Sequence, residues 1–417
     1  LRNSSVETHQ VNFSKEYSFF TSMGTYQPFS FQMITLISFI SLLFVNFTLG
    51  SNDFYVMSNQ TSTTNCGNST FPCGTISSGI FAACNYYEST GSTNITVWVY
   101  SGNYIETDVS TIDCPLTVRS FDGSSTTTIK PINRTAPNAF DVNNPGGSVS
   151  ITGFTISSSE VNESIFSFFR TGDVYIEDIV IIGGNITSCI DSNFGDSLSI
   201  SSFSMNSLTV SQYITVSNVN NITLNDICLS GNIQVRNTLK SLFDFSGYDA
   251  FTMRDSNFTG IMGFYRFLAC QSDDETGITI LDNIYIFQIK GHEIFATLSS
   301  LIRTNGFLYM SNCQIANIQG FQDLLNHKGG VEIYNNNFVA IENVDSIFSI
   351  RHDYSLQNGS IDFRDTNISM VYPNDSIFDI FASDIIHFGN MSIQEIMTNS
   401  LMLISNTEVF GYIIIED

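Results

Sequence analysis

One degenerate line of residues recurs through most of the chain, and it constrains the fold more than any other feature. The line alternates two apolar residues with polar ones, continues with Asp or Asn, and returns to an apolar residue, as in VEIYNNNF at 331–338. Its copies start 23 to 30 residues apart. They start at Val149, Val174, Leu198, Ile222, Phe251, Thr279, Leu308, Val331, Ile361 and Ile386.

Alternation with a period of two predicts a strand with one buried face. The Asp or Asn predicts a bend, because its short side chain tolerates left-handed backbone. A second apolar strand follows, and a third apolar segment comes later in the copy, as in SIFSI (346–350) and SIFDI (376–380). Three short strands joined by bends form one coil of a parallel β-helix, whose neighbouring coils pair about 4.8 Å away.

Other repeat architectures fit this pattern poorly. A propeller blade needs four antiparallel strands joined by hairpins, and a leucine-rich repeat needs regularly spaced Leu. We therefore predict one solenoid of about a dozen coils from about residue 90 to 417, with the marked polar residues at bends in register. These residues include Asp178, Asp226, Asp255, Asn335, Asp365 and Asn390.

The front of the chain predicts a cap for this solenoid. In CGTISSGIFAACNYY (73–87) the apolar residues form one helical stripe, and Thr75 is placed to cap the helix. An alternating strand and a turn follow in NITVWVYSGNYIE (94–106). A helix across the first coil would cover an end that could otherwise pair with further strands.

These segments, with CPLTVRS at 114–120, resemble the opening of the pectin-lyase-like superfamily. The resemblance covers about residues 73–417 and implies an all-β fold, a right-handed parallel β-helix with a short N-terminal capping helix. The Asn-rich, Phe/Ile-rich composition is also similar to secreted or surface β-helix proteins of amoeboid protists. Three regions are expected: an extension with a signal peptide or anchor (1–50), a Cys-rich cap with the helix (51–115), and the coils (116–417).

Residues 17–52 carry no Lys, Arg, Asp or Glu, and they contain the apolar run from Met33 to Gly50. This run is interpreted as a cleaved secretory signal; the alternatives are a retained membrane anchor and a buried helix. The protein is therefore expected to be secreted or at the cell surface. It would meet a membrane only through this run or through a C-terminal segment beyond the present sequence.

Eight cysteines support the same compartment. Four crowd near the front, and we favour Cys66–Cys73 within a loop and Cys84–Cys114 between helix and strand. A zinc site is the alternative, but short Cys-x-x-Cys pairs and a nearby His are missing. The other four are expected to be packed core thiols: Cys189, Cys228, Cys270 and Cys313.

Beyond residue 50, twelve Asn-x-Ser/Thr sequences permit N-glycosylation of a secreted chain. They are Asn59, Asn68, Asn94, Asn133, Asn162, Asn185, Asn221, Asn257, Asn358, Asn367, Asn374 and Asn390. The net charge of −24 makes nucleic-acid binding unfavourable, because such a surface repels phosphates. The expected partners are a glycan or another surface protein, and no cofactor is expected.

Some members of the resembled superfamily hydrolyse polygalacturonan with paired Asp residues beside Gly-His-Gly and Arg-x-Lys motifs. This chain offers Asp273 and Asp274, followed by Gly291-His292-Glu293, but it lacks the last Gly and the Arg-x-Lys. Asp273, Asp274 and His292 are therefore weak catalytic candidates, and DSNFGDS (191–197) is read as a turn instead of a calcium loop. The predicted function is binding, adhesion or a structural role. The alternative is a carbohydrate-active enzyme, either a polygalacturonase-like hydrolase or a polysaccharide lyase.

Overall fold

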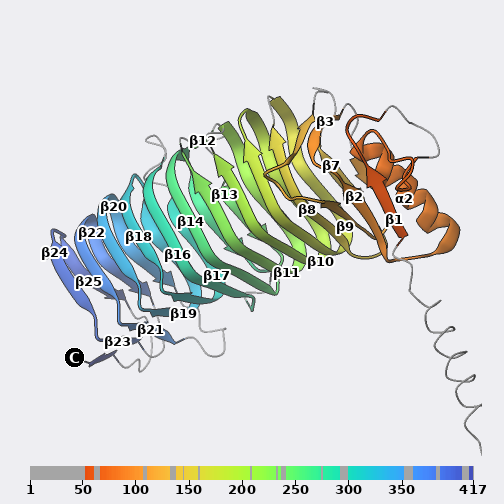
Figure 1. Cartoon of the computed structure of the whole chain (residues 1–417). Helices are drawn as coiled ribbons and strands as arrows, with labels where there is room; N and C mark the ends of the chain where they lie inside the picture. The colour runs from red at the N-terminus through yellow and green to blue at the C-terminus, as the bar shows by residue number, and fades with distance from the viewer. Residues whose placement is uncertain are drawn as a thin grey trace, which may run out of the picture. The chain divides into compact units, whose positions relative to one another are not determined.

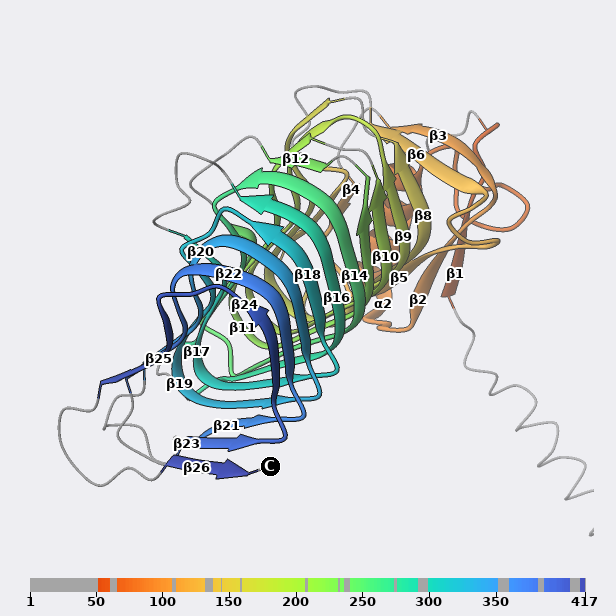
Figure 2. The ribbon, with the colours of Figure 1, turned by 90° about the vertical axis from the view of Figure 1, so that its left-hand side faces the viewer.

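The computed structural model describes residues 52–60, 66–106, 110–131, 138–143, 145–157, 160–206, 209–231, 233–235, 241–273, 276–291, 299–351, 360–381, 386–405 and 413–416. In these residues the chain winds into a stack of coils in which every strand pairing is parallel (Figures 1 and 2). Within the same residues, no helix combines the length and the apolar character needed to cross a bilayer. The predicted parallel β-helix is confirmed. The run from Met33 to Gly50 lies outside the described residues.

The coils share three sheets, one for each apolar segment of the repeat. The first sheet stacks the segments that begin the repeated line, and several of its long strands continue around corners into the other sheets. Its strands are β1 (Asn52–Val56), β2 (Ile95–Val99), β5 (Leu116–Ser120), β8 (Val149–Ser157), β9 (Glu160–Ile182), β10 (Asn185–Asn206), β11 (Thr209–Ser230), β14 (Ala250–Phe264), β16 (Ile278–Gly291), β17 (Ser300–Ser311), β19 (Asp323–Tyr334), β21 (Ile361–Arg364), β23 (Ile386–Gly389) and β26 (Ile413–Glu416).

The second and third sheets complete each coil. Strands β8 to β11, β14 and β16 contribute to the second sheet beside β3 (Gly102–Glu106), β6 (Thr127–Pro131), β12 (Ile233–Val235), β18 (Gln314–Gln319) and β24 (Ser392–Ile396). The third sheet includes β4 (Ser110–Ile112), β7 (Phe140–Asn143), β13 (Ser241–Ser246), β15 (Arg266–Gln271) and β25 (Ser400–Ser405). Strands β20 (Asn337–Arg351) and β22 (Asn367–Phe381) run from the second sheet into the third.

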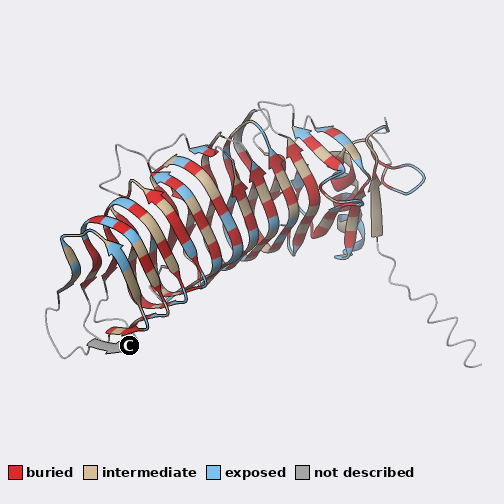
Figure 3. Cartoon of the chain, turned by 60° about the vertical axis from the view of Figure 1, so that its left-hand side comes forward, coloured by how far each residue is buried: buried red, intermediate tan, exposed pale blue. Residues whose placement is uncertain are grey.

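The core fills the inside of the stack with one apolar residue from every second strand position (Figure 3). Aromatic rings from neighbouring coils meet there. Phe243 lies 4.9 Å from Tyr213 and 5.2 Å from Phe267 between ring centroids, in edge-to-face geometry. The inward-facing apolar residues of each coil pack against those of the neighbouring coils. The buried residues therefore form one continuous core along the stack.

The marked bend positions all adopt left-handed backbone, as predicted. The ten residues at this place in successive copies have positive φ: Gly153, Asp178, Ser202, Asp226, Asp255, Asn283, Asn312, Asn335, Asp365 and Asn390. Their side chains bond along the stack. Asn283 Nδ2 donates to Asp255 Oδ1 at 2.6 Å, and Asn335 Nδ2 donates to Asn312 Oδ1 at 2.8 Å. The predicted bends are therefore in register.

A second bend row was not predicted. It follows the second apolar segment, and its members are aligned across adjacent coils. They also have positive φ: Gly231, Gly260, Gln288, Asn317, Ala340, Met370 and Glu395. Several of these residue types strongly disfavour left-handed backbone, so their identities gave no sign of a bend.

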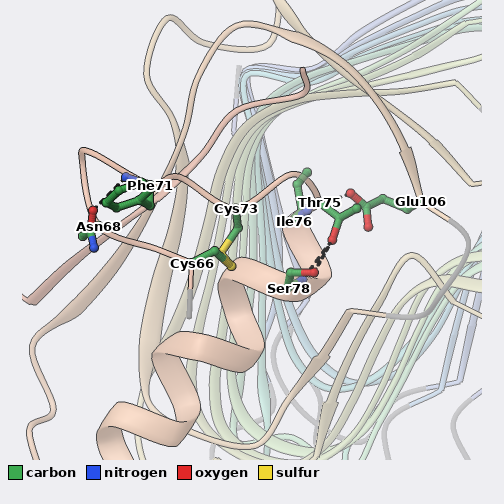
Figure 4. Close-up of a disulfide and its surroundings, with 8 residues drawn as sticks. All are labelled: Cys66, Asn68, Phe71, Cys73, Thr75, Ile76, Ser78 and Glu106. Carbon is green, nitrogen blue, oxygen red and sulfur yellow. Dashed lines mark hydrogen bonds between the residues drawn. A yellow bond between two sulfur atoms is a disulfide. The ribbon is translucent and has the colours of Figure 1, made fainter. Parts of the chain in front are cut away.

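The predicted capping helix is α2 (Ile76–Thr90), which packs on Val56 and Val97 at the N-terminal end of the core. Thr75 caps it, accepting a hydrogen bond from the Ser78 backbone N–H at 3.1 Å (Figure 4). A contact that was not predicted adds to this cap. The buried Glu106 carboxylate accepts from the Ile76 backbone N–H at 2.8 Å, which places negative charge at the positive end of the helix.

Two disulfides form with the favoured pairing, Cys66–Cys73 and Cys84–Cys114. Coils begin within the Cys-rich region, because β2 already pairs with β5 and β3 with β6.

The four later cysteines are all free thiols, and Cys189, Cys270 and Cys313 are buried as predicted. Cys228 is a correction. It is only half-buried, because it stands between the inward-facing Ile227 and Leu229 and therefore faces outward.

Candidate functional site: the outward face of the first sheet

The first sheet presents two parallel columns of outward side chains, because outward residues alternate with the buried ones along each strand. The first column is Asp53, Thr96, Thr117, Ser150, Tyr175, Ser199, Thr223, Thr252, Ile280, Tyr309, Glu332, Asp362 and His387. The second column is Tyr55, Trp98, Arg119, Thr152, Glu177, Ser201, Asn225, Arg254, Asp282, Ser311, Tyr334 and Arg364.

An aromatic strip occupies the N-terminal end of this face. It consists of Tyr55, Tyr100, Phe121 and Trp98, in that order of contact. The Tyr55 and Tyr100 rings stack with centroids 6.2 Å apart, and Tyr100 and Phe121 stack at 5.4 Å. Phe121 also meets Trp98, the chain's one tryptophan, at 5.3 Å. Phe121 is 54% exposed, and the other three rings are half-buried. Four touching rings therefore reach the surface together.

Polar groups hold the strip in place. The Trp98 indole N–H donates to Asp53 Oδ1 at 3.0 Å, and the Arg119 guanidinium lies 5.8 Å from the centre of the Trp98 ring. Ser101 Oγ donates to the exposed Asp122 carboxylate beside the rings. Burial raises the pKa of Tyr55, and the nearby Asp53 carboxylate raises it further, so the phenol stays neutral and able to donate. The strip thus combines flat apolar area with fixed hydrogen-bonding groups.

Short polar side chains fill the middle of the face. From β8 to β14 the first column carries mainly Ser and Thr, as at Ser150, Ser199 and Thr252. These short side chains are rich in hydroxyls, and one larger residue, Tyr175 on β9, stands among them with 44% of its surface exposed. Rows repeat from coil to coil about every 4.8 Å, which suits an extended ligand lying along the stack.

Titratable residues gather at the C-terminal end of the face, in four consecutive coils. We call Tyr309, Glu332, Asp362, Arg364 and His387 the acid–histidine cluster. Asp362 Oδ1 lies 2.9 Å from His387 Nδ1, and Asp362 Oδ2 lies 2.6 Å from the Arg364 guanidinium. Glu332 is the register neighbour of Asp362, and Tyr309 that of Glu332. A carboxylate and an imidazole in contact can exchange a proton, and a guanidinium beside them can bind an anionic group.

Asp282 carries a permanent negative charge between the two ends. It accepts hydrogen bonds from Ser311 Oγ at 2.6 Å and from Asn312 Nδ2 at 2.9 Å. The bond from Ser311 is the main reason why the pKa of Asp282 lies below its ordinary value. This part of the face is therefore acidic at any physiological pH.

Of the catalytic candidates taken from the sequence, only Asp273 lies among the described residues. Asp273 is exposed in the bend after β15, where its carboxylate lies close to Gly247. Asp274 and His292 lie outside the described residues. The segment from Asp191 to Ser197 runs within β10 and bends at Phe194, in agreement with its reading as a turn.

Metal ligands come close together at one place in the described residues, where Cys84, Asp113 and Cys114 meet. The two sulfurs are joined in a disulfide and so offer no thiolate.

Seven of the twelve glycosylation candidates are exposed in the structure: Asn59, Asn68, Asn94, Asn221, Asn257, Asn374 and Asn390. Asn185 and Asn367 are half-buried, and Asn162 lies in β9. Asn133 and Asn358 lie outside the described residues.

No family model matches the chain, and no curated protein matches its sequence. Three solved structures have a backbone similar to that of this chain. The A-module of the mannuronan C-5 epimerase AlgE4 of Azotobacter vinelandii is 12% identical, with a TM-score of 0.35 over 80% of this chain and 95% of that one. The surface protein and adhesin PfbA of Streptococcus pneumoniae is 9% identical, with a TM-score of 0.30 over 82% and 95%. The AlgE6 A-module of Azotobacter vinelandii is 12% identical, with a TM-score of 0.23 over 82% and 93%. At these scores the likenesses carry no functional argument, and the protein is assigned to the class of parallel β-helix proteins on its own strand pairing.

Proposed function

We propose that this protein is a secreted or cell-surface β-helix protein that binds an extended glycan along the outward face of its first sheet. The observation that carries the proposal is the aromatic strip of Tyr55, Tyr100, Phe121 and Trp98. The C–H face of a sugar ring packs against aromatic side chains, while its hydroxyls bond to carboxylates, hydroxyls and phenols. Asp53, Asp122 and Ser101 supply such partners beside the rings.

The remaining columns support the same proposal. Ser and Thr continue from the strip, so a chain of sugars anchored there would meet hydroxyl groups in the coils from β5 to β14. The net charge of −24 favours a neutral glycan over an acidic one at this surface. The two disulfides fit an oxidising compartment outside the cell.

Isothermal calorimetry on the full chain tests the proposal. The neutral probe is soluble mixed-linkage β-glucan, and the acidic comparison is polygalacturonan. We expect the β-glucan to bind, and we expect Trp98→Ala with Phe121→Ala to lower its affinity at least about tenfold, because each ring contact contributes about 0.5–1.5 kcal/mol beyond the area that it buries. The matched control is Phe81→Ala on α2, which removes another exposed ring (69%) away from the strip. Equal affinity of the double variant and the control, or no binding of either polysaccharide, would contradict the proposal.

A second candidate function, a carbohydrate-active enzyme, is favoured by the acid–histidine cluster. Asp362 and His387 are in contact, Arg364 could hold a sugar carboxylate, and Glu332 offers a second carboxyl group one coil away. The test is incubation with polygalacturonan, comparing the wild type with Asp362→Asn and His387→Gln. Product that disappears in both variants would support an enzyme. Product that depends instead on Asp273, Asp274 and His292 would move the active site to that loop.

A further inference from the structure

Arg266 is a buried cation at the start of β15, at the corner where the chain enters the third sheet. It is 8% exposed, and its Nε is buried with no hydrogen-bond partner in the described part of the chain. Most of the equivalent places in other coils carry a short hydroxyl side chain, so the fold does not require a long cation here. Examples are Ser164, Ser188, Ser241, Ser346 and Ser376.

Two further charges lie near Arg266 on the outward face of the third sheet. Along this face Asp244, Ala269 and Arg303 are register neighbours in three successive coils. The charges of Asp244 and Arg303 both act on Arg266, and Arg303 is exposed to solvent. The Arg266 Cζ also lies 5.1 Å from the centre of the Tyr265 ring. Two guanidinium groups are therefore close enough to repel each other, and one of them faces solvent.

The two positive charges are not fully compensated by the described residues. In that part of the chain, no ion pair joins either arginine to a carboxylate. Burial lowers the pKa of Arg266, and the charge of Arg303 lowers it further, against the smaller opposing effects of Tyr265 and Asp244. A buried charge is costly unless it is paired and hydrogen-bonded. With 39 acidic and 15 basic residues in the chain, composition alone does not explain two neighbouring cations without a carboxylate in contact.

We infer that Arg266 and Arg303 bind one oxyanion, a carboxylate or sulfate group of an external ligand, on the outward face of the third sheet. A guanidinium holds its N–H donors in a planar fork that matches two oxygens of such a group. Asp244 and the exposed Asp273 after β15 would repel further anions, which favours a ligand with one anionic group over a polyanion. The site lies on a different sheet from the aromatic strip and does not depend on the proposed function of that strip.

Ligand-observed NMR titration of the full chain, at constant ionic strength, tests the inference with three probes. Glucuronic acid and the sulfate ester of glucose carry the two kinds of oxyanion, and glucose carries none. We expect at least one anionic sugar to bind, and glucose to bind at least about tenfold more weakly. Arg303→Gln should weaken the anionic sugar at least about tenfold, because it removes one of the two charges from an exposed position. Arg254→Gln, which removes an exposed arginine from the first sheet, is the matched control and should leave binding unchanged.

Inorganic sulfate distinguishes a free anion from an anionic sugar as the ligand. It should displace the bound sugar, because the site recognises the oxyanion, and a failure to displace it would contradict the inference. If inorganic sulfate and the sulfate ester bind equally well, the oxyanion alone is recognised. Tighter binding of the ester would show that the sugar ring also contributes contacts.

A second variant separates binding from folding. Arg266→Met replaces the buried cation with an apolar side chain, so it should abolish binding of the anion without lowering the melting temperature. Trp98→Ala with Phe121→Ala should leave anion binding intact, whatever those changes do to polysaccharide binding. The inference is overturned if neither anionic sugar binds, if glucose binds as well as they do, if Arg266→Met still binds the anion, or if Arg303→Gln binds like the Arg254→Gln control.

Discussion

At the left-handed bends, the identity of a single residue directly affects the stability of the stack. The first bend row places Asp, Asn, Ser or Gly at each turn, and these residues tolerate positive φ. The second row places Gln288, Ala340, Met370 and Glu395 at similar φ values of 52° to 55°. Left-handed backbone costs a residue other than Gly, Asn or Asp about 1–2 kcal/mol, so the second row stores strain that the Asp, Asn and Gly of the first row largely avoid.

Ala340→Gly should therefore stabilise the protein. Relief of the left-handed strain outweighs the extra freedom that glycine gives the unfolded chain, about 0.4–1 kcal/mol, so unfolding should cost up to about 1 kcal/mol more. Ala250→Gly is the matched control, because Ala250 begins the extended strand β14, and it should lower stability by about 0.5–1 kcal/mol. Thermal melts of both variants provide the measurement. Shifts in the same direction would show that the backbone at Ala340 is not strained.

The two bend rows also explain which residues could be predicted. Asp and Asn at a fixed place in a period-two pattern carry a physical preference, so the first row was predicted from sequence. Ala340 and Met370 carry none, and only the register of the folded stack places them at a bend. The acid–histidine cluster was not predicted, but the sequence held enough information to find the column that contains it. Glu332, Asp362 and His387 hold the same outward place in three successive copies, and aligning those places would have found the column.

Among the elements, α2 depends most on covalent and capping support. It is 15 residues long, closed by Thr75 at one end and by the left-handed Gly91 at the other. Its apolar stripe was predicted from a helical period, because local spacing is enough for that. The aromatic strip could not be predicted in the same way. Its rings come from β1, from β2 and from residues just after β2 and β5, and strand register alone brings them together.

Removing the Cys84–Cys114 disulfide, which joins α2 to the first coils, should destabilise the N-terminal end of the stack. Cys84→Ala with Cys114→Ala opens a loop of 30 residues, and unfolding of the N-terminal coils should become about 2–4 kcal/mol easier. Cys228→Ser, which changes a half-buried free thiol, should have little effect. Melting curves of the oxidised proteins, with non-reducing peptide maps, test both statements. Free thiols at all four front cysteines of the purified wild type would contradict the disulfide assignment and the compartment inferred from it.

At the scale of the whole molecule, each coil contacts only the coils beside it, so stability is a sum of local terms. Phe243 is a central example. It is fully buried and meets rings from other strands and coils, with Phe258 5.4 Å and Phe267 5.2 Å away. Truncating such a ring removes about 3–5 kcal/mol of packing. In a protein built this way, the loss should stay near the coils that made the contacts.

Hydrogen exchange measured by mass spectrometry should therefore show a local effect of Phe243→Ala. Amides of β11, β13, β14 and β15 should lose protection, while β2 and β5, next to the Cys84–Cys114 bond, should keep theirs. Phe388→Ala in β23 is the comparison, because its ring packs on Phe363 and Phe378 in the last coils, and its effect should remain there. If either variant instead lowered protection evenly from β2 to β23, the stack would unfold as one cooperative unit, and the nearest-neighbour description of its stability would be wrong.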